Sequence, residues 1–565
     1  MTHAERNRRD ALFGLAPRQA MIMLGLLVAL KLATLFVLAW NTQFVMDEFV
    51  QLGWAKYLND GFVETVSHPK ALGYAIFYSL AHLIGWDAAS ILLAGRLQTA
   101  VLACGTLGLI YASARALGED KLRALLIILV LLCFSNFMER IFRTIAEPLA
   151  VFFAAAALLV VVRGQADTVR TVIFAGIFSG LAFLATQKAL YFNLALGIAL
   201  VADAALARRF TAGAIRGALL VLGWMAPIAA YCFIFGGADP LPVAKNLVFG
   251  PVEVATQGAA AYDGLRYFVL QTLARNAILY ALCFAGMILA LARFRSLGER
   301  RRIALVFSVV IAALVFAHDQ PWPYVFVMAL PFISLWWLWV LDRAADHGWV
   351  ARVIWLAVGV AVALSFAKNI AYLQFDNREQ LAVVTRADSL IGPDERYFDG
   401  VAMLPNRREP TALWLDRGQI LSTLNERENS EAYRVFAQTP PRMIIWSERM
   451  DGIYPVVGPL IERRYVRVAP NIRMLGRRLT LGEVTIFDVP RAGLYALYSE
   501  TGKRLSSLVQ VDGSVVGGTF ELASGTREIV LRSGAATALL LPAGSYAGLI
   551  GPGADTDRLF AHVYD

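Results

Sequence analysis

Charged residues are scarce in this chain of 565 amino acids. They make up 17% of the sequence, whereas hydrophobic residues make up 58% and the mean hydropathy is +0.57. Soluble domains contain roughly a quarter charged residues, so this composition argues against a soluble protein and indicates a polytopic membrane protein. The net charge of +9 does not indicate nucleic-acid binding, because the basic residues form short clusters between apolar segments, as cytosolic loops do.

Cysteine is also scarce, and no cleavage pattern follows the first apolar run. All four cysteines lie inside apolar segments without a CxxC spacing, which argues against a zinc site and predicts buried, inert thiols. The first apolar run starts near Ala20, behind a basic N-terminus, and no small-residue cleavage site follows it. We therefore expect an uncleaved first membrane helix with a cytosolic N-terminus.

Long apolar segments are abundant. A helix needs about 20 mostly apolar residues to cross a bilayer, and roughly eleven segments approach this length. The fold is therefore predicted to be mainly α-helical, with a polytopic membrane domain over residues 1–372. The predicted spans are 20–40, 88–116, 122–138, 147–162, 171–187, 190–207, 214–235, 270–292, 303–317, 323–341 and 350–372.

These spans sort the connecting loops onto two faces. One face collects the basic loops and is predicted to be cytosolic; it contains Arg115, Lys121, Arg123, Arg163, Arg170, Arg208, Arg209, Arg216, residues 293–302 and Arg343. The other face is predicted to be periplasmic and collects other ionisable groups, as a site at the membrane boundary would. It contains Asp47, Glu48, residues 67–74, residues 138–148, Lys188, residues 236–269 and residues 317–324.

The C-terminal region has a different composition and is also expected in the periplasm. Residues 373–490 mix polar turns with short apolar runs such as "RMIIW", which predicts a small α/β domain. Residues 491–565 read as short strands between turns, which predicts a β-sandwich-like domain. The "VDG" at 511–513 is typical of a hairpin turn.

Asp47 and Glu48 follow the first span and are the first catalytic candidates. They begin the amphipathic stretch "EFVQLGWAKYL", so the simplest interpretation is that they cap a helix lying along the membrane surface. The acids and bases predicted on the same face favour a functional role instead. Glu147, in "RTIAEP", is the second outer acid.

Basic candidates also gather on the outer face. Lys70 follows His68 in "SHPK", and a snorkelling lysine is the alternative there. Arg96 and Lys31 lie within spans, where charges are functional candidates or pair with a neighbouring helix. Arg140 and Arg143 share a helix face and would suit a phosphate, or an interfacial network with glutamates.

The segment "AHDQPWPY" adds two further candidates at a proline-broken helix entry, His318 and Tyr324. Irregular backbone at membrane depth usually lines a cavity. His68 and His318 could ligate a divalent metal, although no ligand spacing supports one.

In order along the chain, four features resemble the GT-C superfamily of integral-membrane glycosyltransferases. They are the "DE" pair at 47–48, the "HP" pair at 68–69, "LLAGRLQTAVLACGTLGLIYASARAL" at 92–117 and "RTIAEPLAVFFAAAALLVVV" at 143–162. The resemblance covers roughly residues 20–340. It is closest to the protein mannosyltransferase-like and aminoarabinose (lipid A) transferase-like branch, from whose "KPP" the chain departs with "HPK".

The resemblance implies a polyprenyl-phosphate-linked monosaccharide donor and a periplasmic glycolipid, glycan or protein acceptor. Asp47 matches the catalytic acid of the first outer loop, and Glu147 matches a second outer acid. Lys70 and Tyr324 match positions that contact the lipid phosphate. The resemblance requires no cofactor. It also implies a multi-pass protein of the bacterial inner membrane.

Elementary chemistry gives these residues roles. A lipid phosphate leaves more readily once cations neutralise it, so Lys70, Arg96, Arg143 and Lys188, followed by Arg140 and Tyr324, are the predicted phosphate contacts. The acceptor hydroxyl must lose a proton, and Asp47 is the predicted base of an inverting displacement. Glu48 and Glu147 would orient the acceptor or the base.

Two other activities are compatible with many spans. A transporter or flippase of lipid-linked sugars would also need a cationic cavity, but not an acidic pair and a large soluble region on the outer face. An O-antigen ligase or polymerase usually carries a large central outer loop, whereas the soluble mass of this chain is C-terminal.

Overall fold

The computed structural model describes residues 16–61, 71–164, 168–258, 265–345, 347–407, 409, 414–546, 549–556 and 559. The chain forms two compact units. The first, here called the helical unit, comprises Met1–Thr42, Gly61–Tyr78 and Gly95–Phe375. The second, here called the mixed unit, comprises Gln43–Asp60, Ser79–Ala94 and Asp376–Asp565.

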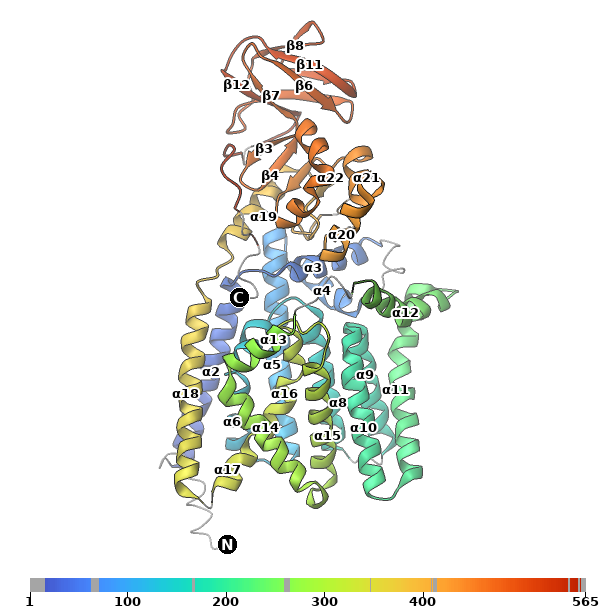
Figure 1. The fold of residues 1–565 in the computed structure, drawn as a ribbon, viewed down its shortest axis with the longest axis vertical. Helices are drawn as coiled ribbons and strands as arrows, with labels where there is room; N and C mark the ends of the chain where they lie inside the picture. Colours follow the sequence, from blue (N-terminus) through green and yellow to red (C-terminus); the bar gives the residue numbers. More distant parts are fainter. Residues whose placement is uncertain are drawn as a thin grey trace. The chain divides into compact units, whose positions relative to one another are not determined.

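Membrane-length helices dominate the helical unit (Figure 1). Six helical segments among the described residues are long and apolar enough to cross a membrane, or seven if one pair bent by 94° counts as a span. The six are α2 (Pro17–Asn41), α5 (Ala88–Ala116), α8 (Ala146–Arg163), α10 (Leu190–Leu206) with its preceding turn, α11 (Phe210–Gly236) and α18 (Gly348–Tyr372). The chain is therefore a multi-pass membrane protein, as predicted.

The predicted number of about eleven spans is not confirmed, because several apolar segments form shorter helices. The predicted span 122–138 forms α6 (Lys121–Leu131), and 171–187 forms α9 (Val169–Ala185), which has 17 residues. The segment 270–292 is the bent pair α13 (Tyr267–Arg275) and α14 (Ala277–Ala292), and α15 (Glu299–Phe316) begins with four charged residues.

The segment 323–341 is not one helix but a chain of short pieces. These are η6 (Val325–Met328), α16 (Leu330–Ile333), η7 (Ser334–Trp336) and α17 (Leu338–Ala344). Residues 325–338 are all buried, so protein rather than lipid surrounds the irregular backbone, the condition for such backbone at membrane depth. Trp336 donates from Nε1 to Ser308 Oγ at 2.9 Å, which satisfies its polar group.

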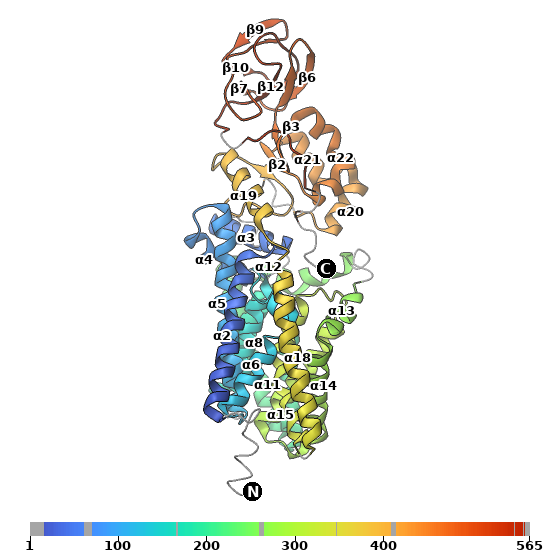
Figure 2. The same cartoon turned by 90° about the vertical axis from the view of Figure 1, so that its left-hand side faces the viewer.

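Helices α9 and α11 are in backbone contact. A Cβ added at Gly176 of α9 would lie 2.4 Å from the Leu220 carbonyl oxygen, and one at Gly223 of α11 would lie 2.3 Å from the Ile173 carbonyl oxygen. Both glycines are therefore required for the close approach, as small residues are in many membrane helix pairs. Helix α10 lies beside both, which completes a three-helix group (Figure 1). Helix α18 lies beside α14 on the side of the bundle seen in Figure 2.

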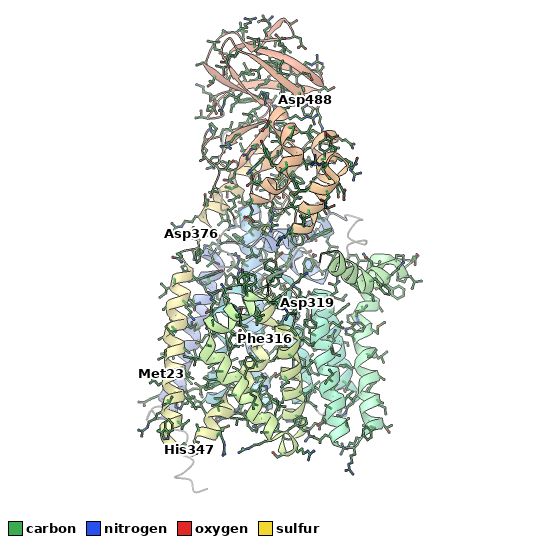
Figure 3. The ribbon with its side chains drawn as sticks, in the orientation of Figure 1. Met23, Phe316, Asp319, His347, Asp376 and Asp488 are labelled. Atoms are coloured by element: carbon green, nitrogen blue, oxygen red, sulfur yellow. The ribbon has the colours of Figure 1, made fainter. Side chains whose placement is uncertain are left out.

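Loops at the two ends of the helical unit carry different groups. Asp319 follows α15, and His347 precedes α18; the two residues lie at opposite ends of the bundle (Figure 3). This arrangement is the one expected for loops assigned to opposite faces.

The mixed unit contains α3 (Met46–Asn59), α19 (Arg378–Leu390) and a four-stranded sheet of order β1-β2-β4-β3. The strands are β1 (Tyr397–Phe398), β2 (Met443–Ile445), β3 (Tyr465–Ala469) and β4 (Ile472–Leu475), with β1 parallel to β2 and the others antiparallel. Helices α20 (Arg417–Glu426), α21 (Glu431–Gln438) and α22 (Glu448–Arg464) bury apolar side chains against it. "RMIIW" supplies the central strand β2.

Two further sheets form the C-terminal sandwich, with strand orders β10-β7-β12-β5 and β6-β11-β8-β9. Their shared core includes Phe487, Leu497, Ile529 and Leu540. The strands begin at Arg477, earlier than the predicted boundary at 491. They are β5 (Arg477–Thr480), β6 (Val484–Val489), β7 (Gly493–Tyr498), β8 (Leu508–Val511), β9 (Ser514–Gly517), β10 (Thr519–Leu522), β11 (Gly525–Leu531) and β12 (Thr537–Pro542).

Candidate active site

Glu147 lies in the first turn of α8, where the positive end of the helix dipole stabilises a carboxylate. Its side chain is 6% exposed, and its Oε1 accepts a hydrogen bond of 2.7 Å from Nζ of Lys188, in the turn η3 (Gln187–Ala189). The lysine is 29% exposed. Glu147, predicted as a catalytic acid, and Lys188, predicted to bind phosphate, therefore form one ion pair.

Tyr324 joins this pair. The Lys188 ammonium lies 4.7 Å from the centroid of the Tyr324 ring, a cation–π geometry. Tyr324 immediately precedes η6, and η6 packs against α8. We call these three residues the Glu147 cluster. It combines a carboxylate, a cation and an aromatic face from three separated segments, a set of groups suited to a charged and partly apolar headgroup.

His318 lies next to the Glu147 cluster. Its Nδ1 is 2.9 Å from the hydroxyl of Tyr191, on α10. Burial and the nearby charge of Lys188 lower the pKa of His318 to about 4, so its imidazole is neutral at pH 7. Within the described ranges, no group of three or more His, Cys, Asp or Glu residues could hold a metal ion. His68, the other predicted metal ligand, lies outside the described residues.

A second group of charges surrounds the short helix α7 (Ser135–Arg140). Arg275 donates from Nη2 to Glu139 Oε1 at 2.8 Å, and Glu139 is fully buried. Arg143 donates from Nε to the Glu139 carbonyl oxygen at 2.9 Å and from Nη2 to the Tyr372 hydroxyl at 2.7 Å. The Glu139 carboxylate is therefore paired with Arg275, whereas Arg143 donates to a backbone carbonyl and a tyrosine hydroxyl. Arg140 is buried as well.

The two groups of charges are neighbours. Helix η6 packs against both α7 and α8, so the buried arginines and the Glu147 cluster lie around the same irregular segment.

Arg96 has a partner set that the sequence did not reveal. Its Nη1 donates to the carbonyl oxygens of Ala39 at 3.2 Å and Thr42 at 2.5 Å, and the residue is fully buried. These carbonyls end α2, where a cation is favoured by the helix dipole. Its guanidinium carbon also lies 5.6 Å from the Phe142 ring centroid, the same distance as that of Arg143.

Lys31 pairs with a neighbouring helix. Its Nζ donates to Ser365 Oγ at 2.7 Å and to Asn369 Oδ1 at 2.8 Å, both on α18. It also lies 4.1 Å from the Phe366 ring centroid. This buried lysine therefore joins α2 to α18, the structural alternative considered for it.

Asp47 and Glu48 belong to the mixed unit and occupy the first turn of α3. Glu48 is fully buried, and its Oε1 accepts from the Val45 backbone N–H at 3.1 Å, which is the expected capping contact. Asp47 is half-buried. The two adjacent acids therefore differ in role, because one carboxylate caps the helix and the other lies partly open to solvent. Lys70 lies outside the described residues.

The mixed unit also contains a buried acid pair that the sequence analysis did not select. Asp399 and Glu409 are 0% and 3% exposed. Asp399 accepts from the backbone N–H groups of Val401, Ala402 and Met403. Burial and the neighbouring Asp399 raise the pKa of Glu409 well above its usual range. Only the isolated Asp399 in an apolar context ("YFDGVAML") marked this loop.

Comparison with solved structures finds chains with a similar fold. ArnT from Cupriavidus metallidurans bound to undecaprenyl phosphate has 13% identity and a TM-score of 0.56, over 80% of this chain and 96% of ArnT. The same protein in the apo state gives 12% identity and a TM-score of 0.54, over 81% and 98% of the two chains. The chain therefore has a GT-C-like membrane fold, as predicted from its motifs.

Sequence comparisons are less informative about activity. Two family models match, each described as a domain of unknown function: DUF7056 over residues 421–474 and DUF7055 over residues 477–542. Their junction falls between β4 and β5, where the α/β sheet gives way to the sandwich. No curated protein matches the chain.

Proposed function

We propose that this protein is an inverting glycosyltransferase that moves a monosaccharide from a polyprenyl-phosphate carrier to a periplasmic acceptor. The observation that carries the proposal is the Glu147 cluster beside buried arginines, within a GT-C-like fold. That fold is shared with ArnT, whose structure contains undecaprenyl phosphate. The acceptor would be a lipid A-type glycolipid, another glycan or a protein.

The proposed step is a single displacement. The acceptor hydroxyl oxygen bonds to the anomeric carbon as the bond between that carbon and the phosphate oxygen breaks, which inverts the centre. The hydroxyl proton goes to the Asp47 carboxylate, and the polyprenyl phosphate leaves with the bonding electron pair. A positioned base typically contributes about 10²- to 10⁴-fold to such a step.

Cations stabilise the leaving phosphate in this proposal. Lys188 supplies one from the Glu147 cluster, while Arg140 and Arg143 supply buried guanidinium groups nearby. Lys70 is a further proposed contact. Arg96, whose Nη1 donates to the end of α2, is another proposed contact. Glu147 would hold Lys188 in place and orient the acceptor.

The location of the enzyme follows from the same proposal. A polyprenyl-linked donor requires a membrane-embedded enzyme, and a periplasmic acceptor requires that the Glu147 cluster face the periplasm of a bacterial inner membrane. The N-terminus would then be cytosolic and the C-terminal sandwich periplasmic.

Mass spectrometry of the envelope tests the proposal. A deletion strain should lack one monosaccharide on a glycolipid, glycan or protein, and wild-type protein should restore it. Asp47→Asn should fail to restore it while reaching normal membrane levels and binding undecaprenyl phosphate within about twofold of wild type. Full activity of Asp47→Asn would overturn the assignment of the base.

Two controls extend this experiment. If the deletion strain has an unchanged glycan profile but an altered distribution of the lipid carrier between the two leaflets, the protein is a flippase and the transferase assignment is wrong. Repeating transfer by isolated membranes in the presence of EDTA tests whether a divalent metal is required.

A further inference from the structure

The backbone of Phe44, three residues before Asp47, is held by a single side-chain amide. The Phe44 N–H donates to Oε1 of Gln380 at 2.7 Å, and Nε2 of Gln380 donates back to the Phe44 carbonyl oxygen at 3.0 Å. Both residues are buried, at 0% and 1% exposure. Gln380 belongs to α19, so one amide fixes the entry to α3 by pairing with it as a neighbouring strand would.

The same amide reaches a third segment. Nε2 of Gln380 also donates to the Leu559 carbonyl oxygen at 2.6 Å. Asp555 and Thr556 are bound to Asn471, the residue immediately before β4: Asp555 accepts from the backbone N–H of Asn471 at 2.7 Å, and the Asn471 amide donates to Thr556 O at 3.1 Å. Gln380 therefore joins three parts of the mixed unit through three hydrogen bonds.

Other contacts restrain the residues between Phe44 and Asp47. The Val45 N–H is bound by Glu48, and Nε of Arg449, on α22, lies 2.9 Å from Sδ of Met46. The Phe44 and Phe49 rings lie 5.5 Å apart. Every residue from Phe44 to Met46 thus has a partner in the mixed unit. Gln380 bonds to both the backbone N–H and the backbone carbonyl of Phe44.

We propose that Gln380 is a positioning residue for the Asp47 carboxylate, and that the C-terminal region of the chain serves the reaction by fixing the start of α3. This inference rests on the proposed function, in which Asp47 accepts the proton. Displacing a catalytic group by about 1 Å can cost about 100-fold in rate. Loss of the amide should therefore lower the rate of transfer without weakening donor binding.

Two substitutions separate positioning from folding. Gln380→Ala removes all three hydrogen bonds. Gln380→Glu keeps an acceptor for the Phe44 N–H. Its other carboxylate oxygen would face the carbonyl oxygens of Phe44 and Leu559 and be repelled by them. Protonation of the carboxyl relieves this repulsion, because its O–H can then donate a hydrogen bond. Gln438→Ala is the matched control, because Gln438 is an exposed glutamine at the end of α21 in the same unit.

The assay uses full-length protein and membranes of the deletion strain, which supply both donor and acceptor. Gln380→Ala should lower the maximal rate at least tenfold and leave the half-saturating amount of membrane within twofold. The rate of Gln380→Glu relative to wild type should rise as the pH falls from 7.5 to 5.5. Hydrogen exchange should accelerate in peptides covering residues 44–48 of Gln380→Ala and stay unchanged in α22.

The outcomes distinguish the two proposals. If Asp47→Asn is inactive while Gln380→Ala keeps the wild-type rate, the positioning role is wrong and the transferase assignment stands. A Gln380→Glu variant whose relative rate does not change with pH also contradicts positioning. If Asp47→Asn is fully active, the base is wrong. Faster exchange at residues 44–48 would then show that Gln380 holds α3 without serving catalysis.

Discussion

Lys188 and Glu147 neutralise each other at a distance of 2.7 Å between Nζ and Oε1. A phosphate that approaches Lys188 therefore meets a cation whose charge is already balanced by a buried carboxylate. Glu147 opposes the binding of an anion in this arrangement, while it keeps the lysine in place beside the Tyr324 ring.

Glu147→Gln should therefore bind undecaprenyl phosphate more tightly and transfer sugar more slowly. Removing the negative charge leaves Lys188 free to pair with the phosphate, and we expect up to about tenfold tighter binding, equivalent to about 1.4 kcal/mol. Titration of the purified protein with undecaprenyl phosphate measures the first effect. Lys188→Met should weaken binding, and Glu299→Gln, at the N-terminus of α15, should leave it unchanged. Unchanged binding by Lys188→Met would contradict a phosphate contact at Lys188, and weaker binding by Glu147→Gln would contradict the opposing role of Glu147.

Lys31→Met should destabilise the protein without abolishing transfer. Lys31 donates to Ser365 and Asn369, and a lost partner leaves buried acceptors unsatisfied, at a cost of about 1–3 kcal/mol. The thermal midpoint of the solubilised protein should therefore fall. Combining Lys31→Met with Asn369→Leu should recover part of the loss, because one unsatisfied polar group is removed as well. Loss of transfer at an unchanged midpoint would instead assign Lys31 a functional role.

Glu409 should make the mixed unit less stable as the pH rises. Its pKa is raised in the folded state by burial and by Asp399, so its contribution is fully present below the unfolded pKa, about 4.3. That contribution is lost progressively as the pH rises from there toward the folded pKa. Glu409→Gln keeps an oxygen for the N–H groups of Asp399 and Gly400 and should flatten this dependence. Thermal midpoints measured from pH 4 to 8 test the sign; an identical slope in both proteins would contradict it.

Gly513→Ala should destabilise the β8–β9 hairpin. Asp512 and Gly513 form its two-residue loop with φ angles of 47° and 89°, as a type I′ turn requires, and a left-handed conformation costs an L-residue about 1–2 kcal/mol. Gly493→Ala is the control, because nothing lies within 4 Å of a Cβ built there and its φ is not positive. Equal midpoints for the two variants would contradict the turn assignment.

The sequence predicted features that depend on local pattern. Long apolar runs gave the membrane helices, and the "VDG" motif gave the hairpin, because the length of a span and the φ angles of a turn are local requirements. The boundary of the sandwich was misplaced because "EVTIFDV" reads equally well as a strand of either sheet. The count of about eleven spans is not confirmed, because hydropathy does not reveal where a helix ends or breaks inside a protein-lined core.

Partners distant in sequence could not be predicted. Loop alternation placed Glu147 and Lys188 on one face, but only the fold shows that they touch. The carbonyl partners of Arg96 depend on where α2 ends, which an apolar run does not define. Gln380 is an ordinary residue of an amphipathic helix, and nothing near it in the sequence marks Phe44, which precedes it by 336 positions. Whether Asp47 acts as the base stays a prediction for the Asp47→Asn experiment.

The backbone contact between α9 and α11 restricts how a lipid substrate could enter. With carbonyl oxygens 2.3 and 2.4 Å from where the Gly223 and Gly176 Cβ atoms would be, no side chains separate the two helices at this crossing, so nothing there can rearrange to admit a hydrocarbon tail. Helices α9 and α11 are therefore closed to a lipid chain at this level. In the proposed reaction, a long isoprenoid chain would then reach the Glu147 cluster from another side of the bundle, and bulky substitutions at either glycine would separate α9 from α11.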